Sequence, residues 1–250
     1  MARYFLEMMY MGGPFNGFQI QPDGRTVQSE TEMAMATLLR KPVTLTGSSR
    51  TDSGVHALQN YFHFDWEGDL PSTFLYNLNA LLPSEVAALS CDQMQDDAHC
   101  RFDAISREYA YHLHLRKDPF RHGRSWYYPY TLDHVALSRA AAVVMEYDDF
   151  TSFSKRNTQV KTFNCRILES AWSFGEEGLV YRVRANRFLR GMVRGLVGTM
   201  LQMGRGKIDE SGLRAVIESR DCTNANFTTP AHGLFLVRVR YPWDGDQLIG

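Results

Sequence analysis

The order of apolar patterns along the chain constrains its fold more than any single residue does. The first 105 residues contain strand-like and helix-like segments in the order β-α-β-β-α-β. In chain order these segments are residues 2–10, 26–39, 43–46, 60–66, 71–82 and 86–94. Prolines mark the helix ends, since Pro42 follows the first helix, Pro71 opens the second and Pro83 closes it. This order is typical of the split β-α-β, or ferredoxin-like, motif.

The rest of the chain shows the same order with one extra helix and no recognisable sequence repetition. The expected strands are 107–115, 165–174, 178–187 and 233–241, with a Glu-Glu-Gly turn joining the middle two, and the expected helices are 132–145, 188–203 and 210–219. We therefore predict an α+β fold with an N-terminal half, 1–105, and a C-terminal half, 106–250. Joining their sheets edge to edge would bury two strand edges, giving one mixed, mainly antiparallel sheet with a central cleft.

Composition excludes several classes of protein. A hydrophobic share of 44% and a charged share of 22% are typical of globular chains and argue against disorder or fibrous structure. No apolar run approaches the roughly 20 residues of a membrane span, and the N-terminus does not show a signal-peptide pattern. The four cysteines stand far apart without a Cys-x-x-Cys pair, which favours free thiols in a reducing cytoplasm.

Charge is distributed unevenly between the two halves. Residues 1–105 hold 6 Lys+Arg and 13 Asp+Glu, a balance of −7, whereas residues 106–250 hold 21 and 15, a balance of +6. A basic half beside an acidic half suggests a polyanionic partner that faces one part of the surface. The alternative is that both sets of charges are solvated faces.

The segment 48–57, Ser-Ser-Arg-Thr-Asp-Ser-Gly-Val-His-Ala, is the most unusual in the chain. If it is extended, Arg50 and Asp52 project to the same side and place a cation beside a reactive carboxylate. The alternative makes Asp52 a turn or capping residue with Arg50 as its surface partner.

Two segments of the second half also carry candidate residues. Tyr109 lies on the expected strand 107–115, where it either packs in the sheet or presents an aromatic face to a cleft. In the expected helix 188–203, Arg190 and Arg194 stand four residues apart and so on one face. Three glycines in that helix, at 191, 195 and 198, suggest that another part of the chain packs close. A buried arginine there requires an anionic partner, for which Asp52 is a candidate, whereas an arginine on the rim would face solvent.

Together these residues resemble a known family. Arg50-Thr-Asp-x-Gly-Val-His-Ala, Arg107-x-Tyr-x-Tyr and Phe188-Leu-x-x-Met-Val-Arg194 are similar to the motifs of the tRNA pseudouridine synthase A family. Shorter echoes such as Gly17-Phe-Gln and His99-x-Arg-Phe make the resemblance collinear over almost the whole chain.

The resemblance implies an isomerase that converts uridine to pseudouridine at positions 38, 39 and 40 of the tRNA anticodon stem-loop. It implies that Asp52 is the catalytic aspartate, that Tyr109 lies beneath the target base and that Arg194 pairs with Asp52. Arg50 would take the place of the flipped uridine or hold its backbone, and Leu234 would pack on the uracil. A homodimer in the cytoplasm is implied, with tRNA as partner and without a cofactor or metal.

This chain departs from the family pattern at a few positions near these motifs. Phe18 stands where the family usually has Trp, Ser49 where it has Gly, and Ser53 where it has Ala. Two alternatives therefore stay open: the same chemistry on another RNA site, and an RNA-binding protein without catalysis. A metal site built from His112, His114, His99 and Cys100 is disfavoured because no further ligand stands at a fixed spacing.

Overall fold

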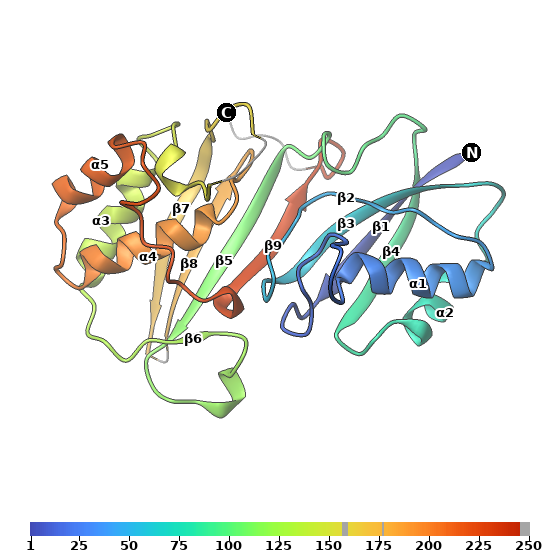
Figure 1. Ribbon diagram of the computed structural model, residues 1–250, viewed down its shortest axis with the longest axis horizontal. Coiled ribbons are helices and arrows are strands. Elements are labelled where there is room, and N and C mark those ends of the chain that lie inside the picture. The colour runs from blue at the N-terminus through green and yellow to red at the C-terminus, as the bar shows by residue number, and fades with distance from the viewer. Residues whose placement is uncertain (157–159, 177, 246–250) are drawn as a thin grey trace. The chain divides into compact units, whose positions relative to one another are not determined.

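The structure is a computed structural model that describes residues 1–156, 160–176 and 178–245. In these residues it contains five α-helices and nine strands, and most neighbouring strands run antiparallel, so the α+β class is confirmed. The chain forms two compact units (Figure 1). Unit 1 comprises residues 1–105 together with the chain from Phe235 onward, and unit 2 comprises residues 106–234.

Unit 1 has the predicted β-α-β-β-α-β order. Its elements are β1 (Ala2–Tyr10), α1 (Val27–Leu39), β2 (Thr46–Gly47), β3 (His56–Trp66), α2 (Phe74–Leu81) and β4 (Val86–Met94), together with β9 (Leu234–Arg240) from its second residue onward. Strand β1 lies between β3 and β4 and is antiparallel to both. Strand β9 runs parallel to β3, with His56 opposite Phe235 and Ala57 opposite Leu236.

This pairing corrects two expectations. The sequence placed the start of the third strand at Asn60, but β3 begins at His56, because His56 and Ala57 find partners in β9, far away along the chain. It also assigned everything after residue 105 to the C-terminal half, whereas the chain from Phe235 onward belongs to unit 1. The short strand expected at 43–46 is shorter still, at Thr46–Gly47.

The helices of unit 1 form a pair that packs on its strands (Figure 1). Helix α1 starts at a capping box in which Thr26 and Ser29 each bond the backbone N–H of the other. Met35 of α1, Leu78 of α2 and Phe62 of β3 are fully or almost fully buried. Burial of such side chains stabilises each by about 1.5–3 kcal/mol, so this layer fixes the sheet that carries the loop before β3.

Aromatic side chains cluster around β1 of unit 1. The ring of Phe5 contacts the rings of Tyr61, His63, Tyr241 and Trp243. The hydroxyl of Tyr241 donates to the Cys100 carbonyl oxygen at 2.5 Å. The chain beyond β9 thereby anchors the loop that contains Cys100.

Unit 2 has the predicted elements and one additional two-residue strand. They are β5 (Ser106–His114), β6 (Trp126–Tyr127), α3 (His134–Val144), β7 (Ile167–Gly175), β8 (Gly178–Ala185), α4 (Met192–Gly204) and α5 (Glu210–Glu218). Strand β8 is antiparallel to both β5 and β7, and β6 is parallel to β5. Helices α3, α4 and α5 pack together (Figure 1). The expected Glu-Glu-Gly turn includes residue 177, which lies outside the described residues.

Helix α4 starts four residues later than the sequence predicted. Gly191 has φ +76, a left-handed conformation that ordinary residues avoid and that cannot continue an α-helix. Arg190 therefore lies in the turn before the helix, where its carbonyl oxygen accepts from the Lys155 N–H at 3.0 Å. The expectation that Arg190 and Arg194 share a helix face is wrong.

The close packing predicted from the glycines of this helix is confirmed. A Cβ atom at Gly195 would lie 2.8 Å from the Phe227 ring, and one at Gly198 would overlap the Asn226 carbonyl oxygen. The segment that follows α5 therefore packs directly on the backbone of α4.

None of the helices in the described parts of the chain is long and apolar enough to cross a bilayer. The joining of the two sheets and the central cleft remain predictions.

Candidate active-site loop

Asp52 opens a tight turn immediately before β3. The Val55 N–H donates to the Asp52 carbonyl oxygen at 3.1 Å, and Gly54 has φ +79, the pattern of a type II turn that requires glycine at its third position. The alternative interpretation of Asp52 as a turn residue is correct for its backbone. The bond that closes this turn is made by the Asp52 carbonyl oxygen, and the residue as a whole is half-buried. The backbone of Asp52 is thus fixed at the first position of the turn.

A buried amide fixes the chain on the other side of this turn. Asn60 in β3 is completely buried. Its Nδ2 donates to the Ser49 carbonyl oxygen at 2.8 Å, and its Oδ1 accepts from the Ser49 N–H at 3.2 Å and from the Tyr61 N–H at 2.9 Å. Both ends of the amide are satisfied, so the penalty for burying it is avoided.

The same amide extends into a chain of hydrogen bonds. Asn60 Nδ2 also donates to the Tyr10 hydroxyl at 3.1 Å, and the Tyr10 and Thr51 hydroxyls share a hydrogen bond at 2.8 Å. Ser49 and Thr51, the two neighbours of Arg50, are therefore both held by buried groups of unit 1. Sequence reasoning missed Tyr10 and Asn60. The available signal was an asparagine inside an otherwise strand-like apolar run, where this residue type is depleted.

The segment after β1 covers the loop from its other side. A Cβ atom at Gly12 would overlap the Val55 carbonyl oxygen, so only glycine fits there. The Gly12 N–H donates to His56 Nδ1 at 3.0 Å, and the Phe18 N–H donates to the Thr51 carbonyl oxygen at 3.1 Å. The segment that follows β1 is thus part of the Asp52 site.

Three of the predicted residues lie in unit 2. Tyr109 of β5 is half-buried and meets the Phe188 ring edge-on, with centroids 5.0 Å apart. Arg194 of α4 is half-buried, and its Nε donates to the Thr229 carbonyl oxygen at 2.7 Å. Leu234 is 6% exposed at the start of β9.

The segment 229–234 connects these positions. The Tyr111 hydroxyl donates to the Pro230 carbonyl oxygen at 2.8 Å, and a Cβ atom at Gly233 would lie 2.7 Å from the Tyr111 ring. Burial raises the pKa of Tyr111, and the nearby positive charge of Arg194 opposes that rise. Since Tyr109 and Tyr111 are two residues apart on β5, they face the same side of the strand. Unit 2 therefore gathers Arg194 and Leu234 around one segment beside this strand, while Arg50 and Asp52 belong to unit 1.

One group of possible metal ligands is present in the described residues. Donor atoms of His63, His99 and Cys100 lie within 4.8 Å of one another. Of the four metal-ligand candidates named from the sequence, only His99 and Cys100 belong to this group, and His112 and His114 do not. His63 Nδ1 already accepts from the Cys100 N–H at 3.3 Å, and burial lowers the pKa of His63 to about 4. Hydrogen bonding within unit 1 accounts for this cluster.

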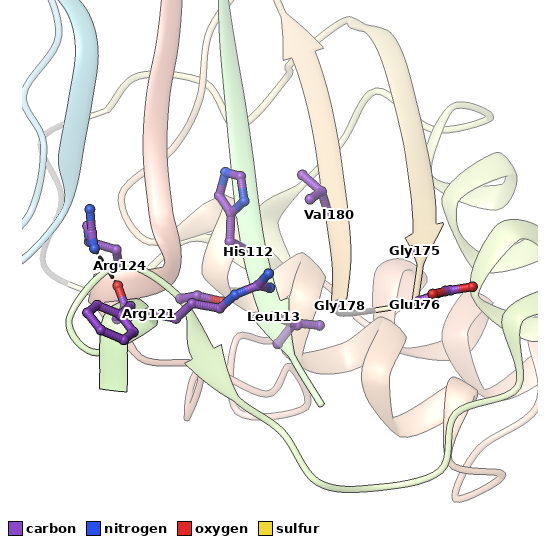
Figure 2. A pocket seen from close by; sticks show the side chains of 10 residues that line it. His112, Leu113, Arg121, Arg124, Gly175, Glu176, Gly178 and Val180 are labelled. Carbon is purple, nitrogen blue, oxygen red and sulfur yellow. Dashed lines mark hydrogen bonds between the residues drawn. The ribbon is translucent and has the colours of Figure 1, made fainter. Parts of the chain in front are cut away.

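Figure 2 shows a pocket of about 630 Å³ in unit 2. Arg121 and Arg124 approach it from the loop after β5, His112 and Val180 line it from β5 and β8, and Glu176 lies at the end of β7. The two arginines belong to the basic half, but Arg121 also pairs with Asp118 at 3.2 Å. The mixed charge gives no preference for a polyanion.

Removal of the Asn60 amide should destabilise the fold and loosen the loop before β3. In Asn60→Ala, the Ser49 N–H and carbonyl lose their partners, so the free energy of unfolding should fall by about 1–3 kcal/mol, as measured in urea. Amide hydrogen exchange at residues 49–55 should accelerate as well, because the loop loses its anchor. The matched control Gln95→Ala removes an exposed amide of unit 1 and should change stability by less than about 0.5 kcal/mol. Unchanged exchange in Asn60→Ala would show that other contacts hold the loop.

Comparisons with known proteins agree with the motifs. The family model described as tRNA pseudouridine synthase matches residues 147–242. A tRNA pseudouridine synthase A from Parabacteroides distasonis is 48% identical over 246 residues, covering 97% of each chain. The namesake from Porphyromonas gingivalis is 44% identical and covers 98% of this chain and 99% of its own. A Staphylococcus aureus relative of the same name is 37% identical, covering 95% and 90%.

Among solved structures, a CRISPR endoribonuclease bound to RNA gives 10% identity and a TM-score of 0.21 over 82% of this chain and 97% of its own, too little to support an inference. The relatives, by contrast, match at high identity over nearly the full length of both chains. The Arg50-Thr-Asp loop, with its buried scaffold, lies within this matched length, and the chain belongs to the tRNA pseudouridine synthase A family.

Proposed function

We propose that this chain converts uridine to pseudouridine in tRNA, at positions 38, 39 and 40 of the anticodon stem-loop. Family membership supports the isomerisation and the tRNA substrate. The observation that carries the proposal is the Asp52 turn. A buried hydrogen-bond network holds the chain around a half-buried carboxylate, which is the pre-organisation that a reacting group requires.

The reaction moves one bond of the nucleotide. The bond between N1 and C1′ breaks, the uracil turns, and a bond from C5 to C1′ forms. The proton on C5 is removed and N1 becomes protonated, so atoms and electrons balance without a redox partner. Asp52 supplies the carboxylate beside the ribose, either as the nucleophile at C1′ or as the base at C2′.

The other predicted residues take supporting roles. Tyr109 lies beneath the target base, and either Tyr109 or a water accepts the C5 proton. Leu234 packs on the uracil, and Arg194 pairs with Asp52. Arg50 holds the RNA backbone or fills the space left by the flipped uridine, which offsets part of the few kcal/mol that extrusion costs.

The proposal extends to the setting of the reaction. The surplus of 21 Lys+Arg over 15 Asp+Glu in residues 106–250 suits contacts with RNA phosphates, which predicts salt-sensitive binding. By family resemblance we also propose a homodimer that works in the cytoplasm.

Two alternatives differ in their consequences. The same chemistry on another RNA site is motivated by Phe18, Ser49 and Ser53, which depart from the family pattern beside Asp52. An RNA-binding protein without catalysis is disfavoured by Asp52 itself, because a carboxylate at the centre of a phosphate-binding surface repels its ligand.

Mapping of the product tests the proposed site. Purified wild-type protein, incubated with unmodified tRNA, should produce pseudouridine at positions 38–40, detected by mass spectrometry of the digested tRNA. The control is the same tRNA with cytidine at these positions, which should yield none. Pseudouridine confined to other positions would favour the first alternative, and its absence from every RNA tested would favour the second.

A double-mutant cycle tests whether Arg194 pairs with Asp52. If they pair, the changes in free energy of unfolding for Asp52→Asn and Arg194→Gln should couple by about 1 kcal/mol or more. Arg166→Gln is the matched control, since Arg166 is an exposed arginine of the same unit just before β7, and it should be additive with Asp52→Asn within about 0.5 kcal/mol. Additivity of Arg194→Gln with Asp52→Asn would contradict the pair in the free protein.

A further inference from the structure

A second pocket lies beside the Asp52 loop within unit 1. Its volume is about 220 Å³, and its walls include Phe18, Gln19, Arg50, His99, Arg101 and Phe102. Pockets that enclose a whole small molecule usually measure about 300–1,000 Å³, so this one suits a part of a larger ligand. Arg50 stands two residues before Asp52, and two residues span at most about 7 Å. Whatever fills this pocket is therefore close to the proposed reaction.

The rim of the pocket displays an aromatic ring to solvent on a rigid support. Phe102 is 73% exposed, although its neighbour Cys100 is completely buried. The loop is closed by Asp103, which accepts from the His99 N–H at 2.6 Å, and by His99, whose carbonyl oxygen accepts from the Phe102 N–H at 3.1 Å. The Tyr241 hydroxyl also donates a hydrogen bond to the Cys100 carbonyl oxygen of this loop. Because these hydrogen bonds fix the backbone around Phe102, its exposed ring is positioned to contact a ligand.

Ring contacts hold the side chain of Phe102 as well, one tilted and one edge-on. The His99 ring lies against it with centroids 4.2 Å apart, and His63, buried in β3, meets His99 at 4.5 Å. The Arg101 guanidinium lies over the Phe102 ring at 5.7 Å, within the range of a cation–π contact. The aromatic face and the cation are thus presented together.

The charge of the pocket contrasts with that of its surroundings. The first 105 residues carry 13 Asp+Glu and only 6 Lys+Arg, yet Arg50 and Arg101 both line this pocket. Among its described lining residues there is no Asp or Glu. Two of the six cations of residues 1–105 thus line a single pocket beside Asp52.

An aromatic face with two arginines matches one nucleotide of a single strand. A base stacks on an exposed aromatic ring, and its phosphate binds arginine. We propose that this pocket, here called the Phe102 subsite, binds a nucleotide next to the target uridine, with its base on Phe102 and its phosphate between Arg50 and Arg101. The proposal rests on the proposed function and adds a contact that positions the RNA on unit 1.

Equilibrium binding of anticodon stem-loop RNA to the full chain tests this subsite. Phe102→Ala should weaken binding about tenfold or more, since stacking of one base contributes on that scale. The matched control is Tyr76→Ala, which removes a side chain 78% exposed on α2 of the same unit and should bind like the wild type. Both changes affect exposed side chains, and unchanged thermal unfolding verifies the fold.

An RNA with an abasic nucleotide makes the test specific. When the base on one side of the target uridine is absent, the wild type should lose about tenfold in affinity and Phe102→Ala should lose nothing further. Arg101→Gln should lower the slope of log K against log salt by about 0.7, the value for one single-strand phosphate. Equal binding by Phe102→Ala and wild type, or full sensitivity of Phe102→Ala to both abasic positions, would overturn the subsite.

The two levels of the proposal fail differently. If the wild type forms pseudouridine in tRNA while Phe102→Ala matches it in all binding measurements, the subsite alone is wrong. If the wild type neither binds the stem-loop nor forms pseudouridine, the proposed function is wrong and the subsite is wrong with it.

Discussion

The buried amide of Asn60 is the interaction on which the geometry of the candidate site depends. It lies inside β3, where an unsatisfied polar group would cost on the order of 1–3 kcal/mol, and it finds all of its partners in Ser49, Tyr10 and its own strand. These bonds leave the loop little choice of conformation. Arg50 lies between two anchored residues, and Asp52 follows at once in a turn that Gly54 permits. A buried side chain inside β3 thereby restrains the conformation of the loop before that strand.

Much of the fold could be predicted from the sequence, because apolar periodicity and proline placement are local signals. The order of elements in each unit follows from them. Two element boundaries were not predicted. The start of β3 depends on non-local pairing with β9, and the start of α4 depends on the left-handed backbone of Gly191, which apolar periodicity does not reveal. In both cases a contact or a dihedral angle overrides the local pattern.

The candidate site divides in the same way. Asp52, Tyr109 and Arg194 stand in motifs that resemble those of a family, so they could be named from the sequence. The residues that hold them could not. Tyr10 and Asn60 act through hydrogen bonds across strands β1 and β3, and Thr229 meets Arg194 through a backbone carbonyl that carries no sequence signal. The net charge of each half also does not predict the charge of a single pocket, since the acidic half contains a pocket lined by Arg50 and Arg101.

The central claim is that the Asp52 carboxylate performs the isomerisation, and release of tritium from C5 of labelled uridine in tRNA tests it most directly. Wild-type protein should release tritium, because forming the bond from C5 to C1′ displaces that hydrogen. Asp52→Asn, which keeps the shape of the side chain and removes its charge, should release none above background while the protein remains folded. Equal release by both proteins would contradict the account, since the chemistry would then not require this carboxylate.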